Sequence, residues 1–197
     1  MNTEYTFTAI TDEISMWDAV FTTNECRFFF EHCFSLNTLH QGEIKLFGKR
    51  VPVPRLESFH CNEAINYTYS GKLLNAAPFT PELLEIKTKV ERLTGHSFNC
   101  VLINVYRNGQ DSNGWHADNE KELGKNPIIA SVSFGSTRTF KLRSTEGTEQ
   151  YSIPLTAGSL LLMGQQVQHQ FKHCIPKEPK ITEPRVNLTF RTILELR

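Results

Sequence analysis

The chain has 197 residues, 39% of them hydrophobic and 11% aromatic, and its 21 basic and 21 acidic side chains give a net charge of zero. This length and apolar content suffice for one packed domain, or for one domain with an extension. The balanced charge gives no support to a nucleic-acid binder that acts through overall basicity, so any such attraction must come from local clusters at residues 45–55 and 172–180. No apolar run approaches membrane-spanning length, so we expect no membrane partner.

The number and spacing of the cysteines bear on whether the protein works in a reducing or an oxidising compartment. The five cysteines are odd in number, include no Cys-x-x-Cys pair and follow no signal peptide; they are Cys26, Cys33, Cys61, Cys100 and Cys174. This pattern favours a reducing compartment and free thiols. We therefore expect an intracellular protein, in the cytoplasm if it is bacterial and in the nucleus if it is eukaryotic.

Two helices are predicted in the first half of the chain. Thr23 or Asn24 can cap a helix that runs through residues 25–31. Thr80 followed by Pro81 marks the start of a second helix, because proline is favoured at the first helical position. The apolar side of this second helix, which ends near Gly95, carries Leu83, Leu84, Ile86 and Val90.

The same region also carries strand signals. Residues 1–20 are weakly patterned and predict no element. Alternation over residues 44–51 predicts a strand, a glycine-containing turn and a return strand. Prolines exclude residues 51–54 from a central strand, because each proline removes a backbone donor. Residues 65–69 alternate and are rich in β-formers, which predicts another short strand.

Beyond residue 98 the chain reads as a series of short strands separated by glycine, asparagine and proline. The predicted strands are residues 98–106, 128–134, 138–142, 151–155, 159–163 and 186–190. Short strands at near-regular spacing predict a two-sheet jelly roll. The fold class is therefore mainly β with flanking helices (α+β). We expect residues 1–95 to form an N-terminal extension packed on a β core of residues 96–197, within a single structural domain.

Three residues suggest a metal centre. His116 and Asp118 are two apart, so in a strand they would share one face and could reach one metal. His173 must come from another strand, and its neighbour His169 is a rival ligand. Two imidazoles and one carboxylate form the facial triad of non-haem Fe(II) oxygenases, which leaves half of the coordination sphere open for a cosubstrate and O2. A lone His-x-Asp is more often a pair of solvated loop residues, so the three must be judged as a set.

A segment near the end of the chain suggests an acid clamp. Arg185 and Arg191 are six apart, and on a strand they share one face with Asn187 and Thr189. A guanidinium binds a carboxylate bidentately and is always charged. The opposite face, with Val186, Leu188 and Phe190, suits a core. Alone, this segment could also be an edge strand with salt bridges. Together with the metal motif it points to an oxygenase that uses a keto acid.

Five motifs in order resemble the AlkB family of Fe(II)/2-oxoglutarate dioxygenases, over about residues 40–195. They are Asn104-x-Tyr106, His116-x-Asp118, the run from Ile129 to Gly135, His173, and the run from Arg185 to Arg191. The resemblance implies a double-stranded β-helix fold, with O2 as a further cosubstrate. It implies His116, Asp118 and His173 as iron ligands. It implies Asn104, Tyr106, Arg185, Thr189 and Arg191 around 2-oxoglutarate.

The N-terminal part resembles the AlkB homologue 2 type, which repairs duplex DNA. The similar segments are Leu46-Phe47-Gly48-Lys49, Val53-Pro54-Arg55 and the run from Asn66 to Gly71. The resemblance implies Phe47 as a wedge in the base stack, with Tyr69 stacked on the flipped base and Tyr67 nearby. The residues expected at the substrate are Phe47, Gly48, Lys49, Arg55, Tyr67, Tyr69, Asn119 and Glu120. Phe47 could also be a hairpin residue packed on the core, and both tyrosines could be half-buried strand residues.

The resemblance implies oxidative demethylation of 1-methyladenine or 3-methylcytosine in DNA, expected to be double-stranded, by a monomer that releases formaldehyde, succinate and CO2. Three departures bear on the substrate. Asn119 replaces the first of two acidic residues that the family commonly has after the iron-binding aspartate, Tyr69 replaces a phenylalanine, and the loop at residues 177–180 is less basic than expected. The alternatives are RNA or protein substrates for the same chemistry, or a non-catalytic module that binds alkylation damage.

Overall fold

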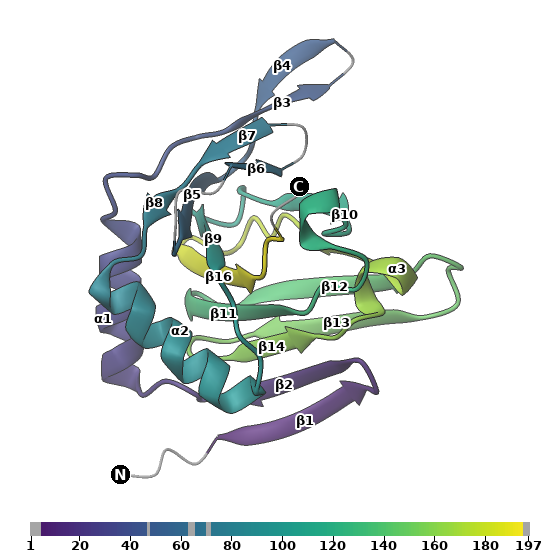
Figure 1. Cartoon of the computed structure of the whole chain (residues 1–197), viewed down its shortest axis with the longest axis horizontal. Coiled ribbons are helices and arrows are strands. Elements are labelled where there is room, and N and C mark those ends of the chain that lie inside the picture. Colours follow the sequence, from purple (N-terminus) through teal and green to yellow (C-terminus); the bar gives the residue numbers. More distant parts are fainter. Residues whose placement is uncertain (1–4, 47, 63–65, 70–71, 195–197) are drawn as a thin grey trace.

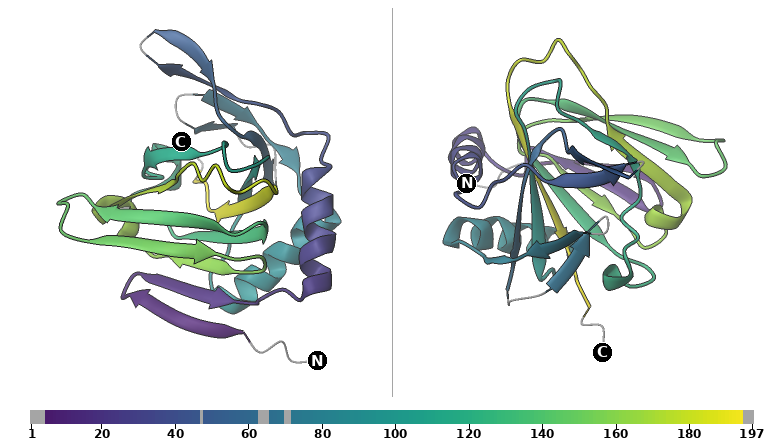
Figure 2. Two further views of the ribbon diagram at one scale, coloured as in Figure 1. Left: turned by 180° about the vertical axis from the view of Figure 1, so that it is seen from behind. Right: turned by 90° about the horizontal axis from the view of Figure 1, so that it is seen from above.

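The computed structural model describes residues 5–46, 48–62, 66–69 and 72–194 (Figure 1). Two β-sheets lie face to face, and two helices cover the outer side of the larger one (Figures 1 and 2). The jelly roll expected from the spacing of short strands is thus confirmed. No helix within the described ranges is long and apolar enough to cross a membrane.

The large sheet is antiparallel except at one edge, where β5 and β8 run parallel. Along the sheet, its strands are β1 (Thr6–Thr11), β2 (Ile14–Asp18), β14 (Leu160–Met163), β11 (Ile129–Gly135), β16 (Arg185–Arg191), β9 (Cys100–Tyr106), β5 (Leu56–Cys61) and β8 (Ala77–Pro78). Strands from before residue 95 lie at both edges of this order, around four strands from after it, so the N-terminal extension contributes to the same sheet as the predicted core.

The small sheet and its connections complete the sandwich. Its strands, in order, are β10 (Asn113–His116), β15 (Phe171–Ile175), β12 (Arg138–Ser144) and β13 (Gln150–Leu155). Two short helices, η1 (Lys121–Leu123) and α3 (Val167–Gln170), lie in the connections that follow β10 and β14.

Two further ribbons stand apart from both sheets. β3 (Glu43–Leu46) pairs with β4 (Lys49–Pro52), which confirms the predicted hairpin, and β6 (Asn66–Tyr69) pairs with β7 (Lys72–Asn75). Both ribbons project from the same end of the molecule (Figures 1 and 2). Gly48, in the turn of the hairpin, has a φ of +80°, a conformation that favours glycine.

The two predicted helices are present, with one cap displaced and one side chain misplaced. α1 (Thr23–Phe34) is capped by Thr22, which forms a capping box with Glu25. α2 (Pro81–Thr94) is capped by Thr80 and ends at Gly95 in the left-handed conformation, as expected. Leu84 was expected on its apolar side, but it is 44% exposed, since the buried stripe consists of Leu83, Ile86 and Val90.

Alternation on the central strands separates the core from the interior of the sandwich. On β16, Val186, Leu188 and Phe190 pack under the helices, in one cluster with Phe29, Ile86, Ile103 and Val132. The intervening residues of β16 point between the two sheets and line a pocket. All seven residues of β16 are buried, so it is a central strand and not the half-buried or edge strand that the sequence left open.

The first 20 residues contain a hairpin that the sequence did not predict. β2 extends the large sheet by pairing with β14, and β1 pairs with β2 at the edge. Four of the six residues of β1 are exposed, and Phe7 packs on Trp17 at the surface with ring centroids 5.1 Å apart. An edge strand that is solvated on most positions lacks the alternation by which buried strands are recognised.

The expectation of five free thiols is wrong. Cys61 and Cys100 lie opposite each other on β5 and β9, with Cα atoms 4.1 Å apart, and form a disulfide. Cys26, Cys33 and Cys174 are free. The pair is 39 residues apart in sequence, and only the register of two adjacent strands brings it together.

Candidate active site

The three predicted metal ligands meet between the two sheets. Their ligand atoms all lie within 4.8 Å of one another. His116 ends β10 and is directly opposite His173 on β15, with ring centroids 4.2 Å apart. Asp118 lies two residues beyond the end of β10, so the prediction that it shares a strand face with His116 is wrong. The turn after β10 brings its carboxylate to within 3.6 Å of His116 Nε2 instead.

Hydrogen bonding sets the tautomer of His116. Its Nδ1 lies 2.7 Å from the carbonyl oxygen of Gly114. Because a carbonyl only accepts, Nδ1 carries the proton and Nε2 carries the lone pair. The Asn113 amide donates to that lone pair at 3.3 Å. Nε2 therefore faces the cluster in the form that binds a metal.

Asp118 is held as a carboxylate. Its side chain is 4% exposed, and its Oδ2 lies 3.3 Å from Arg191 Nη2. Burial raises the pKa of Asp118, but Arg191 and the neighbouring histidines outweigh it and hold the pKa below its usual value. Oδ1 is buried and has no hydrogen-bond partner among the described residues, so one charged oxygen is left facing the cluster.

His173 completes the cluster as a neutral ring. Burial and the neighbouring His116 lower the pKa of His173 to about 3. Its Nδ1 is buried without a hydrogen-bond partner in the described part of the chain. The rival His169 is on α3, is exposed, and contacts the backbone oxygen of Lys125 away from the cluster. A neutral imidazole pair and a carboxylate with orphaned polar atoms fit a divalent metal.

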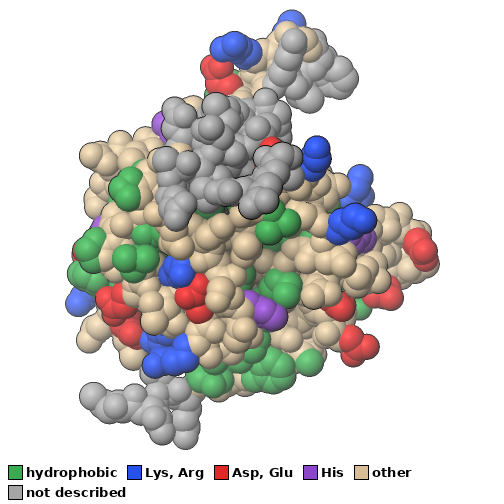
Figure 3. Space-filling view, viewed as in Figure 1, with side chains coloured by type: hydrophobic (Ala, Val, Ile, Leu, Met, Phe, Trp, Pro, Cys, Tyr) green, Lys and Arg blue, Asp and Glu red, His purple; other side chains and the backbone are tan. Residues whose placement is uncertain are grey.

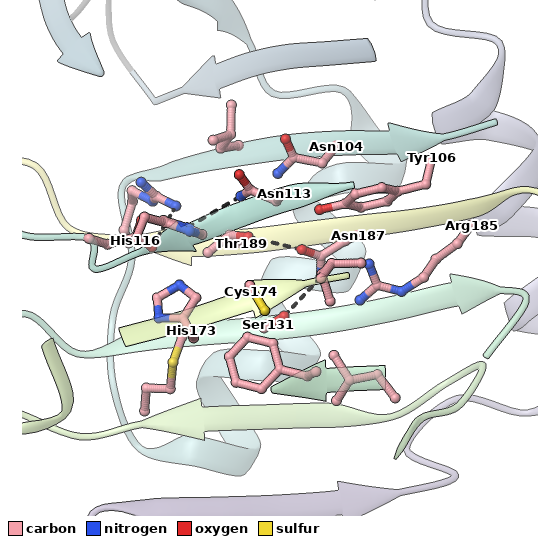
Figure 4. Close-up of a pocket in the computed structure, with 17 residues that line it drawn as sticks. Asn104, Tyr106, Asn113, His116, Ser131, His173, Cys174, Arg185, Asn187 and Thr189 are labelled. Carbon is pink, nitrogen blue, oxygen red and sulfur yellow. Dashed lines mark hydrogen bonds and ion pairs between the residues drawn. The ribbon is translucent and has the colours of Figure 1, made fainter. Parts of the chain in front are cut away.

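Arg185 and Tyr106 form the opposite end of the pocket (Figure 4). Arg185 is fully buried, lies 5.3 Å over the Tyr106 ring, and donates from Nη2 to Ser133 Oγ at 2.9 Å. Its Nε and Nη1 have no partner among the residues described. Burial lowers the pKa of Arg185 to about 10, so the group is still cationic at neutral pH. A buried guanidinium with unused donors fits a ligand carboxylate.

The two arginines of β16 serve different ends of the pocket. Arg185 and Arg191 are six residues apart on one strand, a separation of about 20 Å along the backbone. Arg191 contacts Asp118, whereas Arg185 contacts Ser133 and Tyr106. Only Arg185 is thus placed at the end of the pocket away from the metal cluster.

Amide and hydroxyl groups line the wall between these ends (Figure 4). Asn187 donates to Ser131 Oγ at 2.8 Å and to the Val132 carbonyl at 2.9 Å, and Thr189 donates to Asn187 Oδ1 at 3.3 Å. Asn104 faces the same space from β9. The predicted Asn104, Tyr106, Thr189 and both arginines therefore line one pocket with the metal cluster.

Arg55, one of the residues expected at the substrate, is only 5% exposed. Its Nε donates to Asn104 Oδ1 at 2.8 Å and its Nη1 to Asn113 Oδ1 at 3.3 Å. Glu57 lies 3.9 Å from its Nη2. Arg55 is buried and therefore satisfies its donors with neighbouring side chains. It fixes two amides of the pocket, and one of these, Asn113, contacts His116.

The other residues expected at the substrate lie at separate places or outside the described residues. Phe47 lies outside the described residues, and so do the side chains of Tyr67 and Tyr69 on β6. Lys49 is exposed at the start of β4. Asn119 is exposed beside Asp118, and Glu120 is partly buried at the start of η1.

Buried Arg138 and partly exposed Glu178 form an ion pair that the sequence did not predict. The Arg138 guanidinium is 1% exposed and donates to Glu178 Oε2 at 2.9 Å and to the carbonyl oxygens of Asp111 and Pro176 at 2.9 and 2.6 Å. It also lies 5.5 Å over the Tyr106 ring. Glu178 belongs to the loop that was expected to be basic, and the pair fastens this loop beside the pocket.

Replacing Glu178 by glutamine lowers the free energy of unfolding at pH 7 by about 1–2 kcal/mol, because Arg138 loses a charged partner that is itself partly exposed. Hydrogen bonds from Thr139 and Arg138 outweigh burial and hold the pKa of Glu178 below its ordinary value of 4.5. A depressed pKa adds stability above 4.5 that is lost as the pH falls through the folded value. Urea titrations at pH 7 and below pH 4 check this: the difference between wild type and E178Q narrows in acid. E146Q, on an exposed turn, is the control.

Gln168 also escaped prediction. It is 3% exposed on α3 and accepts a hydrogen bond from the backbone N–H of Asp118 at 2.9 Å. Arg138, by contrast, stands in the strand run after Gly135, where an arginine between β-formers was a visible signal. A glutamine in a short polar segment carries no comparable signal, because its partner is 50 residues away.

Comparison with known proteins supports this geometry. Residues 14–191 match the model of the 2OG-Fe(II) oxygenase superfamily. Human alpha-ketoglutarate-dependent dioxygenase alkB homolog 3 is 44% identical over 150 residues, which cover 71% of this chain and 52% of the relative. The DNA oxidative demethylase ALKBH2 is 40% identical in human and 38% in mouse; the matches cover 78% of this chain and 62% and 67% of those relatives. The chain thus spans about half to two thirds of their length.

The fold is shared more widely. The structure of OsALKBH1 superposes with a TM-score of 0.70 at 14% identity and covers 95% of this chain and 100% of that one. The match to the superfamily model, residues 14–191, includes every residue of the metal cluster and both arginines of β16. A His-Asp-His cluster and a cationic pocket end fit Fe(II) and 2-oxoglutarate as cofactor and cosubstrate. The chain therefore belongs to the 2OG-Fe(II) oxygenase superfamily and, within it, to the AlkB family.

Proposed function

We propose that the chain is an Fe(II)/2-oxoglutarate-dependent oxidative demethylase that removes N-alkyl groups from the bases of DNA. One observation carries the proposal: the His116–Asp118–His173 cluster and the buried Arg185 face one pocket between the two sheets. The names of the relatives support it, since ALKBH2 is a DNA oxidative demethylase.

In this proposal each residue has a stated task. His116, Asp118 and His173 hold iron, which with O2 and 2-oxoglutarate supplies the oxidising chemistry when bound. Arg185 pairs with the carboxylate of 2-oxoglutarate far from the iron, and Tyr106, Asn104 and Thr189 line its path. Arg191 contacts Oδ2 of Asp118 and orients this carboxylate, so that Oδ1 stays available to the metal.

The substrate is an N-methylated base such as 1-methyladenine or 3-methylcytosine. Hydroxylation of the methyl group yields a hydroxymethyl amine that releases formaldehyde, while 2-oxoglutarate leaves as succinate and CO2. A base in a duplex must leave the stack to reach a buried metal. The hairpin of β3 and β4, whose strands flank Phe47 in the sequence, supports duplex DNA as the substrate, and in this proposal Tyr67 and Tyr69 of β6 contact the flipped base.

The surface charge favours a weak electrostatic component of binding. Acidic and basic side chains are interspersed on the face seen in Figure 3, and the net charge is zero. The electrostatic contribution to DNA affinity is therefore modest, and this contribution is easily lost in salt. We propose that the protein acts as a monomer inside the cell.

Formaldehyde release tests this function. The purified protein is given Fe(II), ascorbate and 2-oxoglutarate with matched oligonucleotides that carry 1-methyladenine, one single-stranded and one duplex. Release from the duplex at a rate near or above that of the single strand is expected. Phe47→Ala should then slow the duplex reaction alone, whereas Val51→Ala, an exposed apolar residue on the same hairpin, should change neither.

Other outcomes separate the alternatives. Release from the single strand only keeps the demethylase and removes the wedge role of Phe47. Consumption of 2-oxoglutarate without formaldehyde from either DNA moves the search to RNA or protein substrates. Binding of methylated DNA with no consumption of 2-oxoglutarate in any assay identifies a damage-binding module and overturns the proposal.

A further inference from the structure

Asp118 is the member of the metal cluster that no strand holds. β10 ends at His116, two residues earlier, whereas His116 and His173 are fixed by the pairing of β10 with β15. The backbone N–H of Asp118 donates instead to the side chain of Gln168, at 2.9 Å. At Asp118, a hydrogen bond to a side-chain amide thus takes the place of the backbone hydrogen bonds between paired strands.

Gln168 is itself fixed in place. It is 3% exposed, and its Nε2 contacts the Met163 sulfur at 3.6 Å, which orients the amide so that Oε1 faces Asp118. Met163 is the last residue of β14 and pairs with Ile14 at the start of β2. Gln168 therefore links Asp118 of the metal cluster to β14 of the large sheet.

The tip of the hairpin formed by β1 and β2 fastens the start of α3. The N–H of Gly164 donates to the Glu13 carbonyl at 2.7 Å, and the N–H of Gln166 donates to Glu13 Oε2 at 3.2 Å. A Cβ on Gly164 would lie 2.3 Å from Glu13 Oε2, so a larger side chain at this position would displace the Glu13 carboxylate from α3. α3 is thus bound on one side by Glu13 and on the other by Asp118.

We propose that Gln168 is a positioning residue for the metal-binding carboxylate of Asp118, and that Glu13 holds the helix that carries it. The inference rests on the proposed role of Asp118 as an iron ligand. Arg191 holds one carboxylate oxygen and Gln168 the backbone, so that the remaining oxygen points at the metal. Loss of such an outer partner costs about 10–100-fold in metal affinity or activity.

The test is a titration of the whole protein with Co(II) alone, followed by calorimetry and by the visible absorption of the bound ion. Gln168→Met keeps the length of the side chain and removes the acceptor. It should weaken Co(II) binding at least about tenfold and shift the visible bands at saturation. Gln170→Met, the same change at an exposed position of α3, should alter neither. Glu13→Ala should give a smaller loss of about two- to threefold, because Glu13 acts only through α3.

Gln168→Glu is the rescue variant, because one carboxyl oxygen accepts the Asp118 N–H whether or not the group is protonated. It should bind Co(II) at least about threefold more tightly than Q168M. Equal affinity and spectra for Q168M and wild type overturn the inference, and so does a Q168E as weak as Q168M. If Q168M does not fold, Q168E and E13A decide: unchanged spectra and affinity in E13A together with weak binding in Q168E overturn it. If the wild-type protein binds no Co(II), that result contradicts the proposed function and not the role of Gln168.

Discussion

Replacing Asp118 by alanine abolishes formaldehyde release and weakens metal binding by more than about a hundredfold, since even outer partners of metal ligands cost 10–100-fold. The carboxylate is the one anionic member of the cluster, and its buried Oδ1 faces the two imidazoles. Two neutral histidines alone leave a divalent ion without a counter-charge. Anaerobic Co(II) titration and the formaldehyde assay measure the two losses separately.

The same change also lowers stability. Arg191 is 1% exposed and has Asp118 as a charged partner at 3.3 Å. Removing one member of a buried ion pair costs about 3–5 kcal/mol, because the remaining buried charge loses this partner. Asp118→Asn keeps the shape and a neutral acceptor, so it should lose metal while retaining more stability. Asp12→Ala, in an exposed turn, is the control. Turnover retained in D118A or D118N would show that Asp118 is not a ligand.

Replacing Arg185 by methionine has opposite effects on binding and on stability. Truncating one partner of a buried charge pair costs about 2–5 kcal/mol of ligand affinity, so 2-oxoglutarate binding should fall by about 30-fold or more. Without its ligand, however, Arg185 is a buried cation whose Nε and Nη1 have no partner among the described residues. An apolar side chain of similar length removes that cost, so the unliganded R185M should be at least as stable as wild type.

Thermal unfolding with and without 2-oxoglutarate measures both effects at once. Ligand raises the Tm of wild type by mass action and leaves that of R185M unchanged. Lys172→Met, which removes an exposed charge from β15, should respond to ligand like wild type. A normal 2-oxoglutarate response in R185M would place the carboxylate site elsewhere.

The central strands could be predicted because their sequence reports their environment. β9, β11 and β16 have one face under the helices and one toward the pocket, and their alternation of aliphatic with polar residues follows this geometry. The same alternation placed Asn104, Tyr106 and the residues of β16 in the pocket. It could not show that Arg185 and Arg191 have different partners, because the sequence does not tell which groups lie opposite each end of the strand.

What escaped prediction depends on long-range contacts. Gln168 meets Asp118 across 50 residues, and Cys61 meets Cys100 only through the register of β5 with β9. Arg55 reads as a surface cation in sequence, yet two asparagines and Glu57 satisfy it in the interior. Spacing in one sequence carries no signal of such partners.

The ribbons of β3 with β4 and of β6 with β7 share no hydrogen-bonded strand with either main sheet. The metal cluster and the pocket, by contrast, are built from strands that also form the core. Mutations in the ribbons can therefore accumulate without cost to iron binding or folding, whereas β16 tolerates few. Under the proposed function, selection can retune the choice of substrate by exchanging these ribbons, and a designer can graft a ribbon from one relative onto another while leaving the metal cluster intact.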